Sequence, residues 1–253
     1  LTSDRRYGAS FYTQTVENTK RWWVMLLRDN GLNLTRILVV TAMSLLIGGI
    51  LFRARIEGDR GLQIFISKNG VLFASTFFVG IVQGIMIIPV LANSKAAYYR
   101  ERASLTYSTA TFLIGRSIVE VFWVMVCITI WMCSLYPMAA LDSDVGIIIF
   151  TYIAEIIFVL MLVNMAELFS VCLPSAGAAE SMYATAGGVL NLYAGYFLPV
   201  QQIPWPWKVF YYSCPARFGV QALTPWQFWC SYSCLADNPG GSTSVHEKQL
   251  INF

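Results

Sequence analysis

Long apolar runs alternate with short polar stretches through most of this chain of 253 residues. Five of the runs are close to the roughly 20 residues that an α-helix needs to cross a bilayer. In hydrocarbon, every backbone amide and carbonyl must be paired within its own segment, so apolar runs of this length form helices. The pattern therefore predicts five membrane spans, at about residues 34–52, 70–92, 110–135, 146–168 and 182–198.

The segment ahead of the first span has a mixed pattern. Between Tyr7 and Leu27, aromatic and aliphatic residues such as Trp22 and Trp23 are interspersed with acidic and basic ones. Such a pattern is typical of a helix that lies in the membrane interface, with its aromatic rings at the level of the headgroups. We expect residues 1–30 to form this amphipathic (elbow) helix, followed by a transmembrane domain at 31–198. A soluble helix packed on another domain is the alternative.

The residue composition changes after the fifth apolar run. Residues 199–230 are apolar and aromatic, but they are interrupted by Pro199, Pro204, Pro206, Pro215 and Pro225. Because a straight span does not tolerate so many prolines, we expect short re-entrant helices on the outer side of the membrane. Residues 231–253 are polar and predict an extracellular loop, and the sequence shows no sixth apolar run after it.

Composition supports a membrane protein and excludes several other classes. Hydrophobic residues make up 57% of the chain and charged residues 12%, whereas soluble domains carry about 25% charged residues. The net charge of +3, without a long basic run, argues against a nucleic-acid partner. His246 is the only histidine, so we expect no histidine-based metal site and no catalytic triad. The fold class is thus an all-α, polytopic helical bundle.

Charge and cysteine positions give an orientation. Basic residues are in excess on the side of the N-terminus, which favours a cytoplasmic N-terminus in a multi-pass protein, with the plasma membrane as the expected location. This orientation places Cys214, Cys230 and Cys234 outside, where disulfides persist. These three cysteines allow one bridge within the chain and leave one thiol for a partner chain.

Four ionisable residues lie inside the expected spans, where charge is costly and points to function. Arg116 and Glu120 are four residues apart on one helix face, so we expect them to pair, with Glu167 of the next span at the same depth. This cluster is either a structural clamp between helices or a relay of motion from the cytoplasmic surface. Glu155 lies alone in mid-span and is either protonated or faces an aqueous cavity.

Several short stretches, in order along the chain, resemble the G subfamily of ABC transporters, the White and pleiotropic-drug-resistance group. The resemblance rests on Asn69-Gly70 with Phe73, on Tyr99-Arg100-Glu101-Arg102 with Tyr107-Ser108 and Glu120, on Gly195-Tyr196-Phe197, on Ile203-Pro204, and on the run from Ser213 to Gly219. By themselves, the charged residues at 99–102 also fit a solvated helical turn between two spans.

The chain departs from that family in three places. Val121, Phe122 and Trp123 stand where the family has a proline after the glutamate of the third span, and the sixth span is missing. The chain also contains no Gly-x-x-x-x-Gly-Lys-Ser/Thr loop, so we expect no nucleotide site and no ATPase activity in this chain alone. The resemblance implies that ATP and Mg bind to a nucleotide-binding domain supplied elsewhere.

The resemblance also implies roles for individual residues. Tyr99, Arg100, Glu101 and Arg102 would form a coupling turn that docks on the nucleotide-binding domain, and Arg116, Glu120 and Glu167 would form a polar relay. The substrate cavity, between two such membrane domains, would be lined by Phe77, Phe78, Ile81, Gly188 and Asn191, with Tyr196 and Phe197 as an apolar valve. Without the resemblance, Phe77 and Phe78 would be assigned to helix packing or lipid contact.

These observations predict the membrane-spanning domain of an ATP-driven exporter of lipophilic substrates, such as a lipid, a sterol or a xenobiotic. It would work by alternating access as a homo- or heterodimer of such domains. A membrane channel or scaffold without ATPase activity is the first alternative. A membrane-embedded enzyme is the second, and only the cluster of Arg116, Glu120 and Glu167 offers it a site.

Overall fold

The structure is a computed structural model that describes residues 7–56, 61–139, 141, 144–194, 203–214, 217–219 and 221–224. These residues form helices and connecting turns, and no strand occurs among them. The helices are α1 (Phe11–Arg28), α2 (Asn30–Ile56), α3 (Gly61–Ala103), α4 (Thr109–Met138), α5 (Val145–Cys172), α6 (Ala176–Leu192), the 3-10 helix η2 (Trp205–Trp207) and α7 (Lys208–Ser213). The all-α fold expected from the apolar pattern is confirmed.

Within the described part of the chain, four helices are long and apolar enough to cross a membrane. The segments that meet this criterion are Asn30–Ile50, Asn69–Ala103, Thr109–Met138 and Val145–Cys172. The fifth expected span overlaps α6, which has 17 residues and begins at Ala176, ahead of the expected start at 182. Because residues 195–202 lie outside the described residues, the fifth span stays a prediction.

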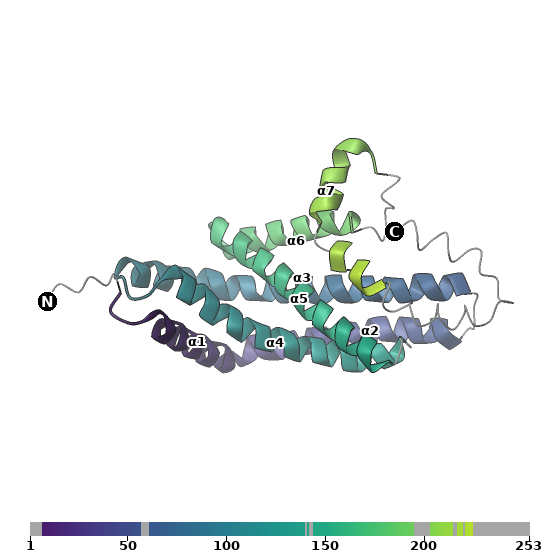
Figure 1. Ribbon diagram of the computed structural model, residues 1–253, viewed down its shortest axis with the longest axis horizontal. Coiled ribbons are helices and arrows are strands. Elements are labelled where there is room, and N and C mark those ends of the chain that lie inside the picture. Colours follow the sequence, from purple (N-terminus) through teal and green to yellow (C-terminus); the bar gives the residue numbers. More distant parts are fainter. Residues whose placement is uncertain are drawn as a thin grey trace.

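The 43-residue helix α3 runs along the long axis of the molecule (Figure 1). It packs chiefly on α5 and also on α6, whereas α1 and α2 both pack chiefly on α4. The turn between α3 and α4 lies at the same end of the molecule as the start of α1 (Figure 1). This arrangement brings the expected elbow helix and the expected coupling turn together.

Local sequence signals define where the helices start. Each of four helices has a Ser or Asp at its N-cap, whose side-chain oxygen accepts a hydrogen bond from a backbone N–H of the first turn. The cap residues are Ser10 of α1, Ser108 of α4, Asp144 of α5 and Ser175 of α6. The other end of α5 is capped from α3, because Lys95 Nζ donates to Leu173 O over 2.8 Å.

Two glycines allow α3 to approach its neighbours closely. A Cβ at Gly80 would overlap Leu162 of α5, and a Cβ at Gly84 would overlap the ring of Tyr183 of α6. Tyr183 Oη donates to the Gly80 carbonyl oxygen over 3.2 Å. Small residues spaced by four along a span are the usual way in which membrane helices come into contact, because their backbones can approach.

The proline-rich outer segment is broken into short pieces, of which η2 and α7 are described. It packs back on the bundle: Leu223 is buried, and Thr224 Oγ1 donates to Asn69 Oδ1 over 2.7 Å. Cys214 is buried too, with its Sγ 3.0 Å from Leu190 O. Cys230 and Cys234 lie outside the described residues, so the expected disulfide stays a prediction.

Candidate coupling site

Helix α1 is held to the bundle by one seam. Gln14, Asn18, Trp22 and Leu26, spaced by four residues, are its buried side chains. In a helix, residues at this spacing lie on the same face, so the four form a single stripe. The stripe faces α4, the helix on which α1 chiefly packs. This segment does form a helix, with polar as well as apolar groups on its buried side, and its placement in the membrane interface stays a prediction.

The contact between the first half of α1 and the start of α4 is polar and closely packed. Gln14 Oε1 accepts hydrogen bonds from the backbone N–H of Ser108 at 3.0 Å and from the Thr111 hydroxyl at 3.5 Å. Further along α4, a Cβ at Gly115 would lie 3.0 Å from the backbone nitrogen of Thr19. Gly115 therefore sets how closely α1 approaches α4, and any side chain there must push backbone away.

The coupling turn follows directly from the end of α3. The N–H of Thr106 donates to Glu101 O at 3.2 Å, and the N–H of Leu105 donates to Arg102 O at 3.1 Å. These two bonds are those of a Schellman motif, which normally has glycine in the left-handed position. Here that position is occupied by Leu105, with φ of 54°. A leucine in this conformation is strained.

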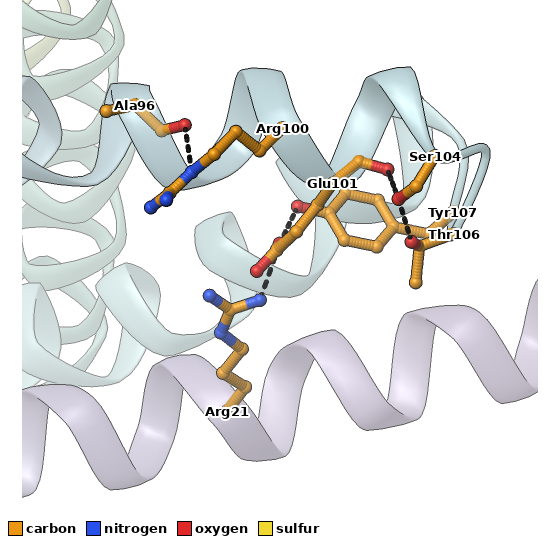
Figure 2. Close-up of polar contacts among 7 residues, drawn as sticks. All are labelled: Arg21, Ala96, Arg100, Glu101, Ser104, Thr106 and Tyr107. Carbon is orange, nitrogen blue, oxygen red and sulfur yellow. Dashed lines mark hydrogen bonds and ion pairs between the residues drawn. The ribbon is translucent and has the colours of Figure 1, made fainter.

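Glu101 connects the turn to α1, as Figure 2 shows. Its Oε2 accepts hydrogen bonds from Arg21 Nη1 at 2.6 Å and from Tyr107 Oη at 2.7 Å. Partial burial, followed by the hydrogen bond to Glu101, raises the pKa of Tyr107, so the phenol keeps the proton that it donates. The hydrogen bond to Glu101 likewise raises the pKa of Arg21. We call Arg21, Glu101 and Tyr107 the elbow clamp.

The other three residues of the predicted coupling turn are exposed. Tyr99 is 54% exposed, and Arg100 and Arg102 are exposed as well. Arg100 Nε donates back to Ala96 O over 3.3 Å (Figure 2). The strained Leu105 is 48% exposed and lies just beyond them. The structure thus turns Glu101 inward and leaves Tyr99, Arg100, Arg102 and Leu105, the turn surface, available for contact.

An aromatic cluster that the sequence analysis did not predict packs against the elbow clamp at Tyr107. Phe112 stacks on Tyr107 with ring centroids 5.7 Å apart, and it also contacts Tyr98 at 4.6 Å and Trp22 at 5.6 Å. The rings come from α1, the end of α3, the turn and α4. The available signal was the concentration of aromatic residues on both sides of the turn, whereas we had assigned Trp22 to the membrane interface and had given Tyr98 and Phe112 no role.

The expected pairing of Arg116 with Glu120 is not what the structure shows. Arg116 forms an ion pair with Glu167 of α5, and its guanidinium also lies 5.8 Å from the centroid of the Trp22 ring. Glu120 instead pairs with Arg36 of α2. The physical reason is competition: Arg36 of the facing helix α2 binds both oxygens of Glu120, and Glu167 of α5 is the carboxylate that pairs with Arg116. The relay residues therefore connect α1, α2, α4 and α5.

Arg36 is the residue of this cluster that the sequence analysis missed. It lies inside the first expected span, but the sequence analysis did not include it among the ionisable residues within the spans. Helix α2 begins at Asn30, so Arg36 is nearly two turns into the helix, and its side chain is fully buried. The signal was present in the sequence as a positive charge within an apolar run.

The residues predicted to line the substrate cavity have different neighbours within one chain. Phe77 stacks on Phe73, with ring centroids 6.1 Å apart, whereas Ile81 packs against Gly187 of α6. Phe78 is 40% exposed, and it lies at a shallow apolar crevice between α2, α3 and α4. Phe78 and Ile81 therefore face different helices in this chain.

The two α6 residues of the predicted cavity, Gly188 and Asn191, differ in their surroundings. A Cβ at Gly188 would meet no atom within 4 Å. Asn191 Oδ1 is shielded from solvent, and no described group donates a hydrogen bond to it. Tyr196 and Phe197, the expected valve, lie outside the described residues.

Comparison with known proteins assigns the chain to a family. Residues 13–228 match the ABC-2 type transporter family, a stretch that covers α1 to α6 and the outer segment. The chain belongs to the ABC-2 type transporter family. It is therefore a transporter membrane domain, and the resemblance to the G subfamily is confirmed by its curated relatives.

Three plant proteins illustrate this relationship. The chain is 28% identical over 235 residues to ABC transporter G family member 38 of Oryza sativa subsp. japonica, covering 89% of this chain and 15% of the relative. It is 25% identical to pleiotropic drug resistance protein 1 of Nicotiana tabacum, and the match covers 93% of this chain and 16% of the relative. It is 27% identical to ABC transporter G family member 35 of Arabidopsis thaliana, and this match covers 95% of this chain and 17% of the relative. The chain thus spans about one sixth of the length of these relatives.

Proposed function

We propose that this chain is the membrane-spanning domain of an ATP-driven exporter of lipophilic compounds. A nucleotide-binding domain that holds ATP and Mg docks on the turn surface from the cytoplasm, where the N-terminus also lies. Two membrane domains, identical or different, form the substrate path at the plasma membrane. Closure of the nucleotide-binding domains moves the turn, and the path opens alternately to the two sides.

The continuity of α3 is the observation that carries this proposal. The same helix bears Phe77 and Phe78 in its apolar part and Tyr99 at its exposed end. At about 1.5 Å per residue, the 21 residues from Phe78 to Tyr99 span roughly 32 Å, which is the thickness of a bilayer core. Helix α3 stays continuous through Pro89, which lies between these two positions, so a push on the turn is delivered along one helix to the proposed cavity residues.

The elbow clamp and the buried ion pairs support a coordinated movement of the other helices. Glu101 joins the end of α3 to α1 through Arg21, while Arg36–Glu120 and Arg116–Glu167 join α4 to α2 and α5. Each contact couples two helices by a directional, charged interaction, and the two buried pairs, Arg36–Glu120 and Arg116–Glu167, are stronger inside the protein than they would be in water. A displacement of the turn thus moves α1 and α4 together with α3.

The chemistry of the proposed cavity supports a lipophilic substrate. Phe77, Phe78 and Ile81 present apolar surface, Gly188 leaves space, and Asn191 Oδ1 offers one acceptor that the described chain does not use. Pockets for small apolar molecules commonly combine such walls with few polar groups. The name of the tobacco relative, pleiotropic drug resistance protein 1, is in keeping with such a substrate class.

Docking of the turn can be tested in the whole transporter with Arg102→Glu. Arg102 is exposed, and no described group pairs with it, so its reversal breaks no side-chain contact of the folded chain and removes only a favourable charge at the C-terminus of α3, worth about 0.3–1 kcal/mol. A charge at an open surface contributes at most about 1 kcal/mol, whereas a partly desolvated interface contact contributes roughly 2–5 kcal/mol. We expect Arg102→Glu to abolish substrate-stimulated ATPase activity while insertion and surface expression stay normal.

The matched control is Lys20→Glu on α1. Lys20 is 66% exposed and pairs only with Glu17, one turn away, so the same change of charge occurs close by but off the turn surface. Lys95 is unsuitable as a control because it caps α5. Full stimulation in Arg102→Glu, equal to that in Lys20→Glu, would remove the coupling role from the turn.

A further inference from the structure

One buried acidic residue takes no part in the coupling site. Glu155 lies in α5, and 2% of its surface is exposed. It therefore does not face an aqueous cavity in this chain, which leaves protonation as the remaining sequence-based alternative. Its carboxyl group contacts α3, the helix on which α5 chiefly packs.

The contact between Glu155 and Ser75 accommodates a protonated carboxyl group. Ser75 Oγ lies 2.5 Å from Glu155 Oε1 and 2.8 Å from the carbonyl oxygen of Leu72. A serine hydroxyl has one proton to donate, so a protonated Glu155 provides the second proton: the acid donates to Ser75 Oγ, and Ser75 donates to Leu72 O. Leu72 O also accepts from Thr76 Oγ1 over 3.1 Å, so the choice between the two forms depends on whether an ionised Glu155 has a cationic partner.

The described charged groups near α5 provide no counterion for an ionised Glu155. Helix α5 packs on α3, α4 and α6, whose described charged side chains are Lys95, Arg100, Glu101, Arg102, Arg116, Glu120 and Glu180. Those on α3 are at least 20 residues from Ser75, which is roughly 30 Å along the helix. Arg116 is already paired with Glu167, and Glu120 with Arg36. The outer segment also packs on α5, at Phe158, and its Arg217 donates to Gln221 and lies over the ring of Tyr211. Within the described residues, Ser75 is the side chain that hydrogen-bonds Glu155.

We propose that Glu155 is a proton-binding site within the membrane, where the bound proton holds α3 and α5 together through Ser75. An intramembrane carboxyl group without a cationic partner is costly when ionised, so protonation and helix contact stabilise each other. By linkage, separating the two helices lets water reach Glu155 and releases the proton. Conversely, removal of the proton at alkaline pH weakens the contact between α3 and α5.

Infrared difference spectroscopy of the whole transporter in lipid vesicles tests the bound proton directly. We expect the wild-type minus Glu155→Gln spectrum at neutral pH to show the loss of a protonated carboxylic acid carbonyl band. Glu17→Gln is the control: Glu17 pairs with Lys20 at the surface, so its spectrum should show the loss of an ionised carboxylate. A carboxylate band in the Glu155→Gln difference spectrum would overturn the proposal.

A second variant assigns the band independently, in case Glu155→Gln fails to accumulate. Ser75→Ala removes the hydrogen-bond partner, so the acid band should shift toward that of a free carboxylic acid. Thr76→Ala is the neighbouring control, because Thr76 donates only to the backbone carbonyls of Leu72 and Phe73. An acid band that is unmoved in Ser75→Ala would show that the proton lies on another residue.

Thermal unfolding against pH tests the linkage without any transport assay, so its result does not depend on the proposed function. The wild type should lose stability relative to Glu155→Gln as the pH rises above about 4, where glutamate ionises in the unfolded chain, until the folded chain also loses the proton, because glutamine does not ionise and its amide still donates to Ser75. Lys68→Gln tests the basic residue that precedes Asn69 on α3. The proton site would be contradicted if the melting temperatures of the wild type and of Glu155→Gln changed with pH in parallel. It would also be contradicted if Lys68→Gln destabilised the wild type but not Glu155→Gln, because Lys68 would then be the partner of an ionised Glu155.

Discussion

Arg36 of α2 and Glu120 of α4 form a two-pronged ion pair in the interior of the bundle. Arg36 Nη1 lies 3.3 Å from Glu120 Oε2, and Arg36 Nη2 lies 3.2 Å from Glu120 Oε1. Their side chains are 0% and 2% exposed. The two charges neutralise each other, so helices α2 and α4 can each carry an ionised residue into an apolar environment.

The first prediction concerns this pair. Arg36→Met or Glu120→Leu alone leaves one buried charge without its partner, which costs about 3–5 kcal/mol. The double variant leaves no charge and should recover most of that stability, since buried pairs are often replaceable by apolar residues of similar volume. Thermal unfolding of the purified protein in detergent measures all three. A double variant less stable than both single ones would contradict the pairing.

A second prediction separates the two possible partners of Arg116. Double-mutant cycles between glutamine variants should give a coupling energy of about 0.5–3 kcal/mol for Arg116 with Glu167, as is usual for residues in contact. The cycle for Arg116 with Glu120 should give a smaller value, although the two are closer in sequence. Equal coupling energies in the two cycles would restore the pairing expected from helix spacing.

The fold was largely predictable because the membrane restricts the choice of structure. Once an apolar run has the length of a span, hydrocarbon leaves helix as the only option, and N-cap residues such as Ser108 and Asp144 mark where it starts. The neighbours of each helix were not predictable in this way. Whether α1 packs on α4 depends on Gly115, whose absent side chain is informative only when the facing helix is known.

The site was predictable in composition but not in pairing. The sequence shows which residues carry charge at each depth, so Glu101, Arg116 and Glu120 could be selected. It does not show that Glu101 turns toward Arg21, which is 80 residues away. The helical spacing favoured a local partner for Arg116, whereas the bundle offers one on α5. Long-range contacts of this kind arise from helix order, which a single sequence leaves open.

A third prediction tests the contact between α1 and α4. Gly115→Ala places a Cβ 3.0 Å from the Thr19 nitrogen and 3.1 Å from Asn18 Cβ, and backbone cannot move aside cheaply. We expect a loss of about 1–3 kcal/mol, as for overpacked cores. Gly49→Ala is the control, since a Cβ there meets nothing within 4 Å. It should stabilise the chain slightly by favouring helix, so equal melting temperatures for both variants would be evidence against the seam.

The fourth prediction isolates one hydrogen bond of the elbow clamp. Tyr107→Phe keeps the ring stacked on Phe112 but removes the donor to Glu101. Hydrogen bonds to charged groups contribute about 1.5–3 kcal/mol, and the partial exposure of Glu101 favours the lower end. Limited proteolysis between α1 and the bundle measures the loosening. Tyr98→Phe, which removes a hydroxyl bonded to Thr109 at 3.0 Å, serves as the comparison and should leave the α1 contact intact.

The last prediction uses the strained position in the turn to separate stability from coupling. Leu105→Gly removes the left-handed strain, so the isolated membrane domain should gain about 1 kcal/mol in unfolding free energy. The same change deletes an exposed apolar side chain from the turn surface, so substrate-stimulated ATPase activity of the whole transporter should fall. Strained backbone is typical of functional sites, where stability and activity oppose each other.

The control is Ala103→Gly, two residues earlier in a right-handed helical position, which should instead destabilise the domain by about 0.5–1 kcal/mol. If Leu105→Gly raises stability and leaves stimulation unchanged, Leu105 does not contact a partner domain, and the docking surface narrows to Tyr99, Arg100 and Arg102.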